Sequence, residues 1–273
     1  MRKFLVRFGI FLVIILLLAG FVALGLYVDA PDRYNVLIIG SDQRDTERAR
    51  SDVLMVFSIP KDPRDQTSLL TVPRDTRVEV PGYGTQKITH AYALGDRPEG
   101  SVLGNRDLVV QTVSTFLDIP IHATLEFTFE SFKSIIDAEG GIRTAEGLLS
   151  GDDALALVRD RYREGGDFAR TEDQRGIFLQ LFQTIHSLKD IQRFQRYIAA
   201  SNQAAVRYEP GPTIQFGFAA GIRRYGRIAI GDVRTEVVPG SGQSIYTPEF
   251  DKDLSYWVPN DQRLRELVTE LFR

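Results

Sequence analysis

An uninterrupted apolar segment near the amino terminus constrains this chain more than any other feature. Residues 8–28 form 21 consecutive positions without a charged side chain, dominated by Leu, Ile, Val and Phe. At about 1.5 Å per residue, a helix of this length just crosses a hydrocarbon layer of roughly 30 Å. Positive residues stay on the cytoplasmic side, and Arg2, Lys3 and Arg7 precede the segment. We therefore expect a cytoplasmic tail (residues 1–7), a transmembrane helix (residues 8–28) and an exported remainder.

Two other interpretations of this segment are weaker. A secretory signal peptide has an apolar region of roughly 7–15 residues, and the nearest small-residue sequence, Val28-Asp29-Ala30, is a poor cleavage site. A buried helix of a soluble domain would show a polar side, whereas this segment is apolar on every face. The pattern favours an uncleaved single-pass anchor with the amino terminus inside.

The composition of the exported part excludes several function classes. The whole chain carries a formal charge of −3 and residues 1–28 contribute +3, so residues 29–273 carry −6. A mildly acidic domain lacks the basic surface of a nucleic-acid binder. The absence of cysteine excludes disulfide scaffolds, thiol nucleophiles and Cys-zinc sites. The three histidines show no pairing typical of a metal site, and no Gly-rich phosphate loop of the dinucleotide or P-loop type occurs.

After a short polar linker at residues 29–34, the apolar pattern predicts one α/β domain over residues 35–273. Short apolar runs bounded by Gly or Pro are typical of buried strands. They occur at residues 36–39, 53–59 and 68–72, with further strands expected at residues 119–127 and 227–238. Helical spacing and capping signals predict helices at residues 105–117, 128–138, 154–158, 171–202 and 260–272. Alternating strands and helices without repeats favour a central mixed sheet flanked by helices.

Charged residues stand directly beside the first three predicted strands, where open α/β sheets usually bind ligands. Asp42 follows the first strand, Asp52 introduces the second, and Arg74 and Asp75 follow the third. Two aspartates on either side of a hairpin-like loop suit one hard cation such as Mg²⁺. This ion takes one or two carboxylates and fills its other positions with phosphate and water. The alternative is that Asp42 is a turn residue and Asp52 a capping residue.

A second group of charged residues spans residues 159–175 and contains five arginines and five acids. The planar guanidinium fork suits phosphate oxygens, but balanced charges equally fit a solvated, salt-bridged helix and loop. Arg159 and Arg161 would point to nearly opposite sides of a continuous helix. Both reach one ligand only if the helix ends near them, which Gly165 and Gly166 favour. The residues alone leave both interpretations open.

Several of these short motifs also occur in a recognisable order along residues 35–273. They are residues 35–44, Arg50-Ser51-Asp52, residues 71–76, residues 87–92, the Arg159 and Arg161 pair, residues 166–170 with Gln174, and residues 255–259. Each motif is weak by itself, whereas the ordered set with this spacing is specific. In this order they resemble the LytR-CpsA-Psr family of bacterial cell-envelope glycopolymer transferases.

The resemblance implies a membrane-anchored, extracytoplasmic phosphotransferase that moves a glycan phosphate from a polyprenyl pyrophosphate carrier onto peptidoglycan. Carried over position by position, Asp42 and Asp52 would hold Mg²⁺ at the pyrophosphate. The residues implied to bind the donor are Arg44, Arg74, Lys87, Arg159, Arg161, Arg170 and Gln174. The catalytic residues would be Arg74, Asp75, Arg161 and Asp167, with Asp75 or Asp167 orienting groups or acting as a base.

The chain departs from the family pattern at two places. Asp173 stands where the family often has another arginine, and the segment between Gly141 and Gly151 is short. Two other functions fit the same binding residues: a pyrophosphatase, with water as the acceptor, and a non-catalytic isoprenoid-lipid-binding regulator of the envelope.

Phosphoryl transfer needs positioning and charge neutralisation more than a covalent protein group, so direct in-line transfer is the expected reaction.

Overall fold

The computed structural model describes residues 31–42, 50–62, 64–95, 104–144, 147–159, 166–183, 206–208, 233–247 and 251–273. The predicted transmembrane helix at residues 8–28 lies outside the described residues, and so do Arg44 and Arg161. Within the described residues, no helix is long and apolar enough to cross a membrane. For Asp167 and Arg170, only the placement of the backbone is described.

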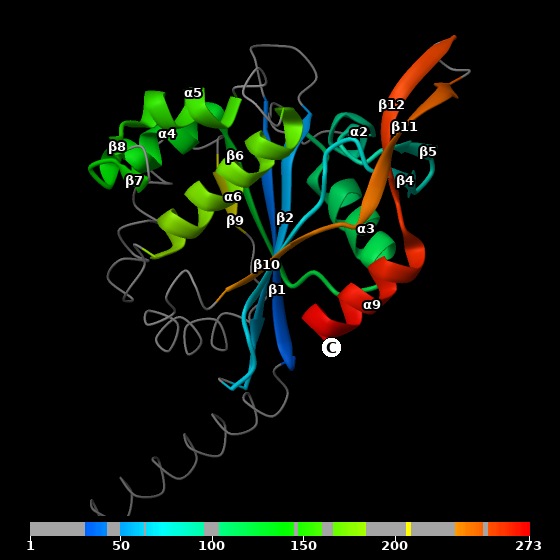
Figure 1. Cartoon of the computed structure of the whole chain (residues 1–273), viewed down its shortest axis with the longest axis horizontal. Helices are drawn as coiled ribbons and strands as arrows, with labels where there is room; N and C mark the ends of the chain where they lie inside the picture. Colours follow the sequence, from blue (N-terminus) through cyan, green and yellow to red (C-terminus); the bar gives the residue numbers. More distant parts are fainter. Residues whose placement is uncertain are drawn as a thin grey trace, which may run out of the picture.

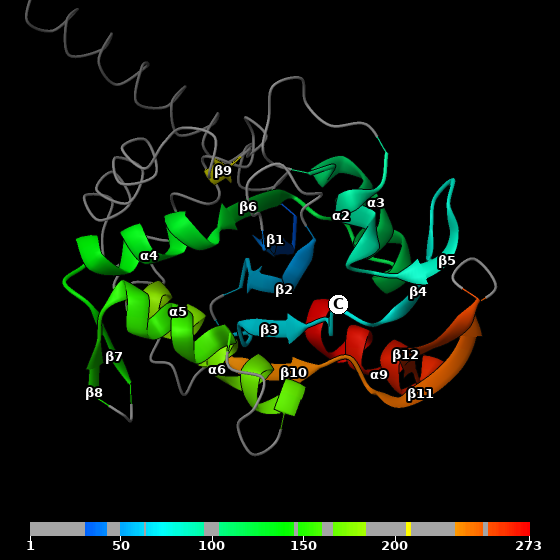
Figure 2. The same ribbon diagram turned by 90° about the horizontal axis from the view of Figure 1, so that it is seen from above.

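A six-stranded mixed sheet forms the centre of the domain (Figures 1 and 2). Its strands, in spatial order, are β10 (Arg234–Val237), β3 (Ser68–Thr71), β2 (Ser51–Pro60), β1 (Arg33–Ser41), β6 (Ala123–Thr128) and β9 (Val206–Tyr208). Strands β1, β3, β6 and β10 run in one direction, and β2 and β9 run against them. The four parallel strands therefore end at the same edge of the sheet, which we call the carboxyl edge.

Helices cover both faces of this sheet (Figure 2). One face, here the α3 face, packs against α2 (His90–Ala93), α3 (Arg106–Leu117) and α9 (Asp261–Phe272). The other, the α6 face, is covered by α4 (Phe129–Ala138), α5 (Gly151–Arg159) and α6 (Gly166–Gln183). Successive side chains of a strand point to opposite faces. Leu37 and Ile39 of β1 accordingly join the core on the α3 face, and Val36 and Ile38 join the core on the α6 face.

Three two-stranded hairpins complete the described part of the domain. They pair β4 (Arg77–Val80) with β5 (Gly84–Lys87), β7 (Ile142–Thr144) with β8 (Gly147–Leu149), and β11 (Gly240–Thr247) with β12 (Lys252–Pro259). The β11–β12 hairpin continues directly from β10, and its second strand contacts β4. Two hairpins that are distant in sequence therefore lie together beside α2 and α3 (Figure 1).

The predicted elements are confirmed where the structure describes them, but several boundaries differ; the helix predicted at residues 154–158, for example, begins at Gly151. The three hairpins were not predicted. The strand predicted from residue 119 begins at Ala123, because Asp118 ends α3 in a left-handed conformation (φ 51°) and Pro120 has no N–H for a ladder. The helix predicted from residue 171 already begins at Gly166, where Asp167 suits the positive end of the helix dipole. The expected continuation at residues 184–202 lies outside the described residues, as does the start of the strand predicted at residues 227–238.

Candidate active site

Asp52 is placed at the carboxyl edge by a β-bulge at the start of β2. Gly40 of β1 pairs with Val53, yet the next residue, Ser41, pairs with Ser51. Asp52 is therefore the extra residue that has no partner in the ladder. Bulges of this kind occur beside active sites because they re-aim one side chain relative to the alternation of the strand. The sequence predicted Asp52 just before the strand. The bulge explains why its side chain does not follow the alternation of side chains along β2.

The bulge requires a close approach of β1 and β2 at Gly40. A Cβ atom added to Gly40 would lie 2.9 Å from the Cβ of Val53 and 3.1 Å from a ring carbon of Phe127. Both atoms belong to packed strands, so any larger residue would push β1 away from its neighbours. Glycine at this position thus keeps the end of β1, and Asp42 directly after it, in line with the edge.

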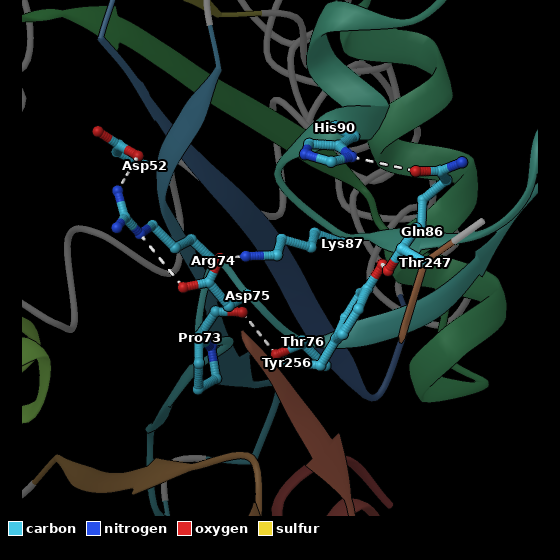
Figure 3. Close-up of polar contacts among 10 residues, drawn as sticks. All are labelled: Asp52, Pro73, Arg74, Asp75, Thr76, Gln86, Lys87, His90, Thr247 and Tyr256. Carbon is cyan, nitrogen blue, oxygen red and sulfur yellow. Dashed lines mark hydrogen bonds and ion pairs between the residues drawn. The ribbon is translucent and has the colours of Figure 1, made fainter. Parts of the chain in front are cut away.

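A row of alternating charges crosses the carboxyl edge (Figure 3). Arg74 donates from Nη1 to Oδ1 of Asp52 at 2.9 Å, and its Nε lies 3.7 Å from Oδ2 of Asp75. Lys87 donates from Nζ to Oδ1 of Asp75 at 2.7 Å. These four residues, here called the charge row, come from the bulge, the segment after β3 and the end of β5. These four residues were predicted as site residues at three separate places in the chain, and the fold brings them into one row.

The charge row is half-buried, which strengthens its electrostatics. The side chains of Asp52, Arg74 and Lys87 are 13%, 19% and 16% exposed, and that of Asp75 is 30% exposed. Charges withdrawn from water interact more strongly than exposed surface pairs, whose contribution is usually small. The two cations balance the two carboxylates, and guanidinium and ammonium groups are donors that suit an anionic ligand.

Backbone hydrogen bonds from two other segments hold the middle of the row. The carbonyl of Arg74 accepts from the N–H of Thr89 at 3.1 Å, and the carbonyl of Asp75 accepts from the N–H of Trp257 at 2.9 Å. The ring of Tyr256 lies beneath Lys87, with Nζ 5.6 Å from the ring centroid, a geometry typical of a cation–π contact. Strand β12 therefore supports the row from below (Figure 3).

Arg159 and Gln174 approach the same edge from the α6 face. Thr128 ends β6 opposite Ser41 of β1, and Phe129 follows it as the first residue of α4. The guanidinium carbon of Arg159 lies 5.0 Å from the ring centroid of Phe129. Gln174 donates from Nε2 to the carbonyl of Val158 at 3.3 Å, which brings α6 against the end of α5.

The condition set for the Arg159 and Arg161 pair, that the helix ends near them, stays a prediction, because residues 160–165 lie outside the described residues. Helix α5 is described as far as Arg159. The first turn of α6 carries Asp167 and Arg170.

Asp42 bends the chain between β1 and β2. Its Oδ1 accepts from the N–H of Arg50 at 2.7 Å, and its own N–H donates to the carbonyl of Arg50 at 3.1 Å. This contact is that of the predicted turn residue, and it leaves Asp42 on the same edge as Asp52. Hard carboxylate oxygens suit Mg²⁺, but no group of three or more His, Cys, Asp or Glu within the described parts of the chain is placed to hold a metal. Two carboxylates are the number that a Mg²⁺ ion takes when phosphate and water fill its other positions.

Sequence reasoning missed three contributors to this site. Phe129 and Tyr256, which lie against Arg159 and Lys87, were not singled out, although residues 255–259 were part of the recognised motif series. Glu126 was expected only as one position of a strand, yet it is fully buried and accepts a hydrogen bond from Tyr92. Their aromatic and strand-forming character is typical of core residues, so the sequence offered no separate signal.

Comparison with known proteins places this geometry in a family. The family model described as the LytR_cpsA_psr family matches residues 25–146 and 142–273. A polyisoprenyl-teichoic acid–peptidoglycan teichoic acid transferase TagU from Enterococcus faecalis is 30% identical over 260 residues, which cover 87% of this chain and 78% of that protein. The corresponding TagU from Halalkalibacterium halodurans is 37% identical over 170 residues, 55% of this chain. This chain spans about half of that relative's length, 52%.

Solved structures show the same fold. The crystal structure of B. subtilis TagV superimposes with a TM-score of 0.66 at 26% identity, covering 89% of this chain and 98% of that chain. A structure described as TagT bound to LIIa-WTA superimposes with a TM-score of 0.65 at 24% identity, covering 88% of this chain and 89% of that chain. These similarities establish the mixed-sheet α/β fold of the described domain.

Proposed function

This chain belongs to the LytR-CpsA-Psr family, and on that premise we propose that it transfers a polyprenyl-pyrophosphate-linked glycopolymer to peptidoglycan. Its relatives are named for transfer of teichoic acid to peptidoglycan. The proposed donor is accordingly an anionic glycopolymer on an isoprenoid carrier, and the proposed acceptor is a hydroxyl of the cell-wall glycan.

The observation that carries this proposal is the charge row at the carboxyl edge. Arg74 and Lys87 are held 2.9 Å and 2.7 Å from carboxylate oxygens, and backbone hydrogen bonds from two other segments fix Arg74 and Asp75. Phosphoryl transfer proceeds mainly by positioning and charge neutralisation, so rigid cations at a strand edge are the parts it needs. Arg159 and Gln174 extend this surface toward α6, and Arg44, Arg161 and Arg170 are proposed to complete the phosphate contacts.

The residues that would hold Mg²⁺ are Asp42 and Asp52, as their position on one edge supports. When bound there, Mg²⁺ would supply Lewis-acid neutralisation of the pyrophosphate oxygens. Asp52 would then share its carboxylate between the metal and Arg74, which ties metal binding to the orientation of the guanidinium fork. Lys87 and Arg74 would neutralise the charge that moves onto the leaving group.

The proposed reaction is a direct, in-line displacement. The acceptor hydroxyl oxygen forms a bond to the glycan-side phosphorus while the bond from that phosphorus to the polyprenyl phosphate oxygen breaks. The hydroxyl proton passes to a carboxylate, Asp75 or Asp167, and polyprenyl phosphate leaves. A loose transition state needs little help from this base. No covalent glycosyl-phosphoryl enzyme is expected, and mass spectrometry of intact protein after incubation with donor alone would detect one.

The amino-terminal segment is proposed to anchor the enzyme beside its lipid substrate. Residues 8–28 would cross the bacterial cytoplasmic membrane and leave residues 35–273 outside the cell. Anchoring would keep the exported domain at the membrane that holds the isoprenoid carrier and beside the peptidoglycan outside it.

The proposed function is tested by reconstituting the full chain in liposomes with a polyprenyl-pyrophosphate-linked teichoic acid precursor, Mg²⁺ and peptidoglycan. We expect glycan phosphate to become covalently attached to peptidoglycan. Release of the glycan phosphate to water, with no attachment, would instead indicate a pyrophosphatase, and donor binding without turnover would indicate a lipid-binding regulator.

Matched variants localise the activity within the domain. Lys87→Ala is expected to reduce transfer by at least tenfold. Arg64→Ala is the control, because Arg64 is an exposed cation paired with Asp62 in the loop between β2 and β3, at the opposite edge of the sheet. If Lys87→Ala is as active as Arg64→Ala, the charge row is not part of the active site.

A further inference from the structure

One acidic side chain lies in the core of the domain and has no part in the charge row. Glu126 is fully buried on β6, where its backbone pairs in parallel register with Ile39 of β1. Ile39 belongs to the core on the α3 face, so Glu126 points into that core. A carboxylate at such a position is costly unless hydrogen bonds compensate for the lost water. Its presence among apolar residues calls for a reason other than packing.

The partner of Glu126 is Tyr92 of α2. The Tyr92 hydroxyl donates to Oε1 of Glu126 at 2.5 Å, and both side chains are fully buried. Burial raises the pKa of Tyr92 most, the Glu126 carboxylate raises it further, and the Ser41 hydroxyl lowers it in part. The phenol therefore keeps its proton and acts as a donor. Both partners are buried, so leaving either one without this hydrogen bond would be costly.

This buried pair lies on the face of the sheet behind the two candidate metal ligands. Ser41 stands two residues beyond Ile39, the β1 partner of Glu126, and therefore shares its face of the sheet. Ser41 immediately precedes Asp42 and pairs with Ser51, which immediately precedes Asp52. Both serines are fully buried. Tyr92 also belongs to the short helix that follows Lys87 of β5 and contacts β2 and β5. One hydrogen bond thus connects β6 with the segments that carry three of the proposed site residues.

We propose that the Tyr92–Glu126 hydrogen bond positions Asp42 and Asp52 for Mg²⁺ bound together with pyrophosphate. This inference rests on the proposed function and adds two positioning residues that do not touch the substrate. An apolar pair of similar volume would pack this core at least as well, because buried polar groups are often neutral or destabilising compared with such a pair. What an apolar pair cannot supply is a directional contact that fixes α2 relative to β6 beside the end of β1.

The test uses variants of the full chain in detergent and separates positioning from stability. The double variant Tyr92→Phe/Glu126→Leu replaces the polar pair by an apolar one and leaves no buried carboxylate behind. The matched control is Thr112→Val, which removes a fully buried hydroxyl on the same face whose only described partner is the carbonyl of Leu108 in its own helix. Calorimetry measures Mg²⁺ affinity in the presence of geranyl pyrophosphate, and thermal unfolding measures stability.

We expect the double variant to melt at or above the wild-type temperature while its Mg²⁺ affinity falls at least tenfold. Thr112→Val should bind Mg²⁺ within twofold of wild type. Glu126→Gln keeps an oxygen that accepts from Tyr92, so its Mg²⁺ affinity should stay within threefold of wild type. If Glu126→Gln loses as much affinity as the double variant, the buried charge and not the hydrogen bond is responsible, and positioning is overturned.

Failure of this inference is distinct from failure of the proposed function. A wild-type chain that transfers glycan and binds Mg²⁺ no better than the double variant overturns the positioning role alone. A wild-type chain that neither transfers glycan nor binds Mg²⁺ with geranyl pyrophosphate overturns the proposed function and this inference together.

Discussion

Replacing Arg74 with lysine separates a phosphate-binding fork from a simple positive charge. Arg74 spans two carboxylates, with Nη1 at 2.9 Å from Asp52 and Nε at 3.7 Å from Asp75. Lysine keeps the charge but has one nitrogen, so it contacts one of these groups at a time. If Arg74 both orients Asp52 and binds a phosphate oxygen, the lysine of Arg74→Lys can keep only one of them, the contact with Asp52 or the contact with phosphate.

The size of the loss follows from the geometry. At 2.9 Å, two unit charges attract by roughly 5–6 kcal/mol at an effective dielectric constant of about 20. Desolvation offsets most of this attraction, because the two side chains are only 19% and 13% exposed. One hydrogen bond to a charged group contributes about 1.5–3 kcal/mol, which corresponds to roughly 10- to 150-fold in kcat/KM. We expect a decrease within that range, with a stability loss of about 1 kcal/mol.

The measurement is kcat/KM for glycan transfer by Arg74→Lys, beside thermal unfolding of the same samples. Arg64→Lys serves as the control, since the Arg64 side chain is 87% exposed and its surface ion pair contributes little. A kcat/KM for Arg74→Lys within twofold of wild type would refute the reasoning, because it would show that charge alone suffices at this position. The reasoning would equally be refuted if Arg74→Lys strongly lowered the unfolding temperature while kcat/KM, corrected for the folded fraction, stayed at the wild-type value.

Three further predictions address the metal, the anchor and the pH dependence. Asp42→Asn should weaken Mg²⁺ binding in the donor complex and reduce the factor by which Mg²⁺ raises donor affinity, which by reciprocity equals the factor by which donor raises Mg²⁺ affinity; calorimetry showing unchanged Mg²⁺ affinity would contradict the site. External protease on intact cells should digest the exported domain and spare the amino terminus, whereas a mature chain beginning near Asp29 would contradict the anchor. Burial lowers the pKa of His122, whose Nδ1 accepts from the N–H of Asn35. Below the ordinary histidine pKa of 6.5, the unfolded chain therefore binds a proton at His122 more readily than the folded chain does. Stability should therefore fall from pH 7.5 to pH 5.5 in melting experiments, and His122→Asn, which retains an acceptor, should reduce that fall.

The strands were predictable because the apolar pattern and the burial come from the same cause. Strands β1, β2 and β3 are covered on both faces, so their sequences form nearly continuous apolar runs that end at Gly or Pro. The capping signals at Thr128 and Ser150 were equally local: Thr128 makes a reciprocal capping box, and the Ser150 hydroxyl donates to Asp153 at 2.6 Å. These features depend on a few neighbouring residues, which is why the sequence contains them.

The pairing of distant segments was not predictable in the same way. Trp257 donates its N–H to Asp75, and β10 pairs with β3, although more than 150 residues separate the partners. No local pattern specifies which strands become neighbours in a mixed sheet. The family resemblance indicated which charged positions come together. It gave no indication for Glu126, because one acid in an alternating strand is normally expected on a solvated face.

The orientation of Asp52 depends on a single inserted residue, which explains why the sequence could not predict it. In the register that pairs Gly40 with Val53, a regular ladder would place Asp52 opposite Ser41. Residues directly opposite in an antiparallel pair share one face, and the Ser41 face is the buried one that contains Glu126. A second acid there would be buried beside Glu126 without water, at a cost above that of losing one ladder position. The bulge puts Ser51, which is fully buried, in that place and leaves Asp52 to meet Arg74. The apolar alternation fixes the register as far as Val53, whereas the bulge follows from the burial of the Ser41 face, which no local pattern shows.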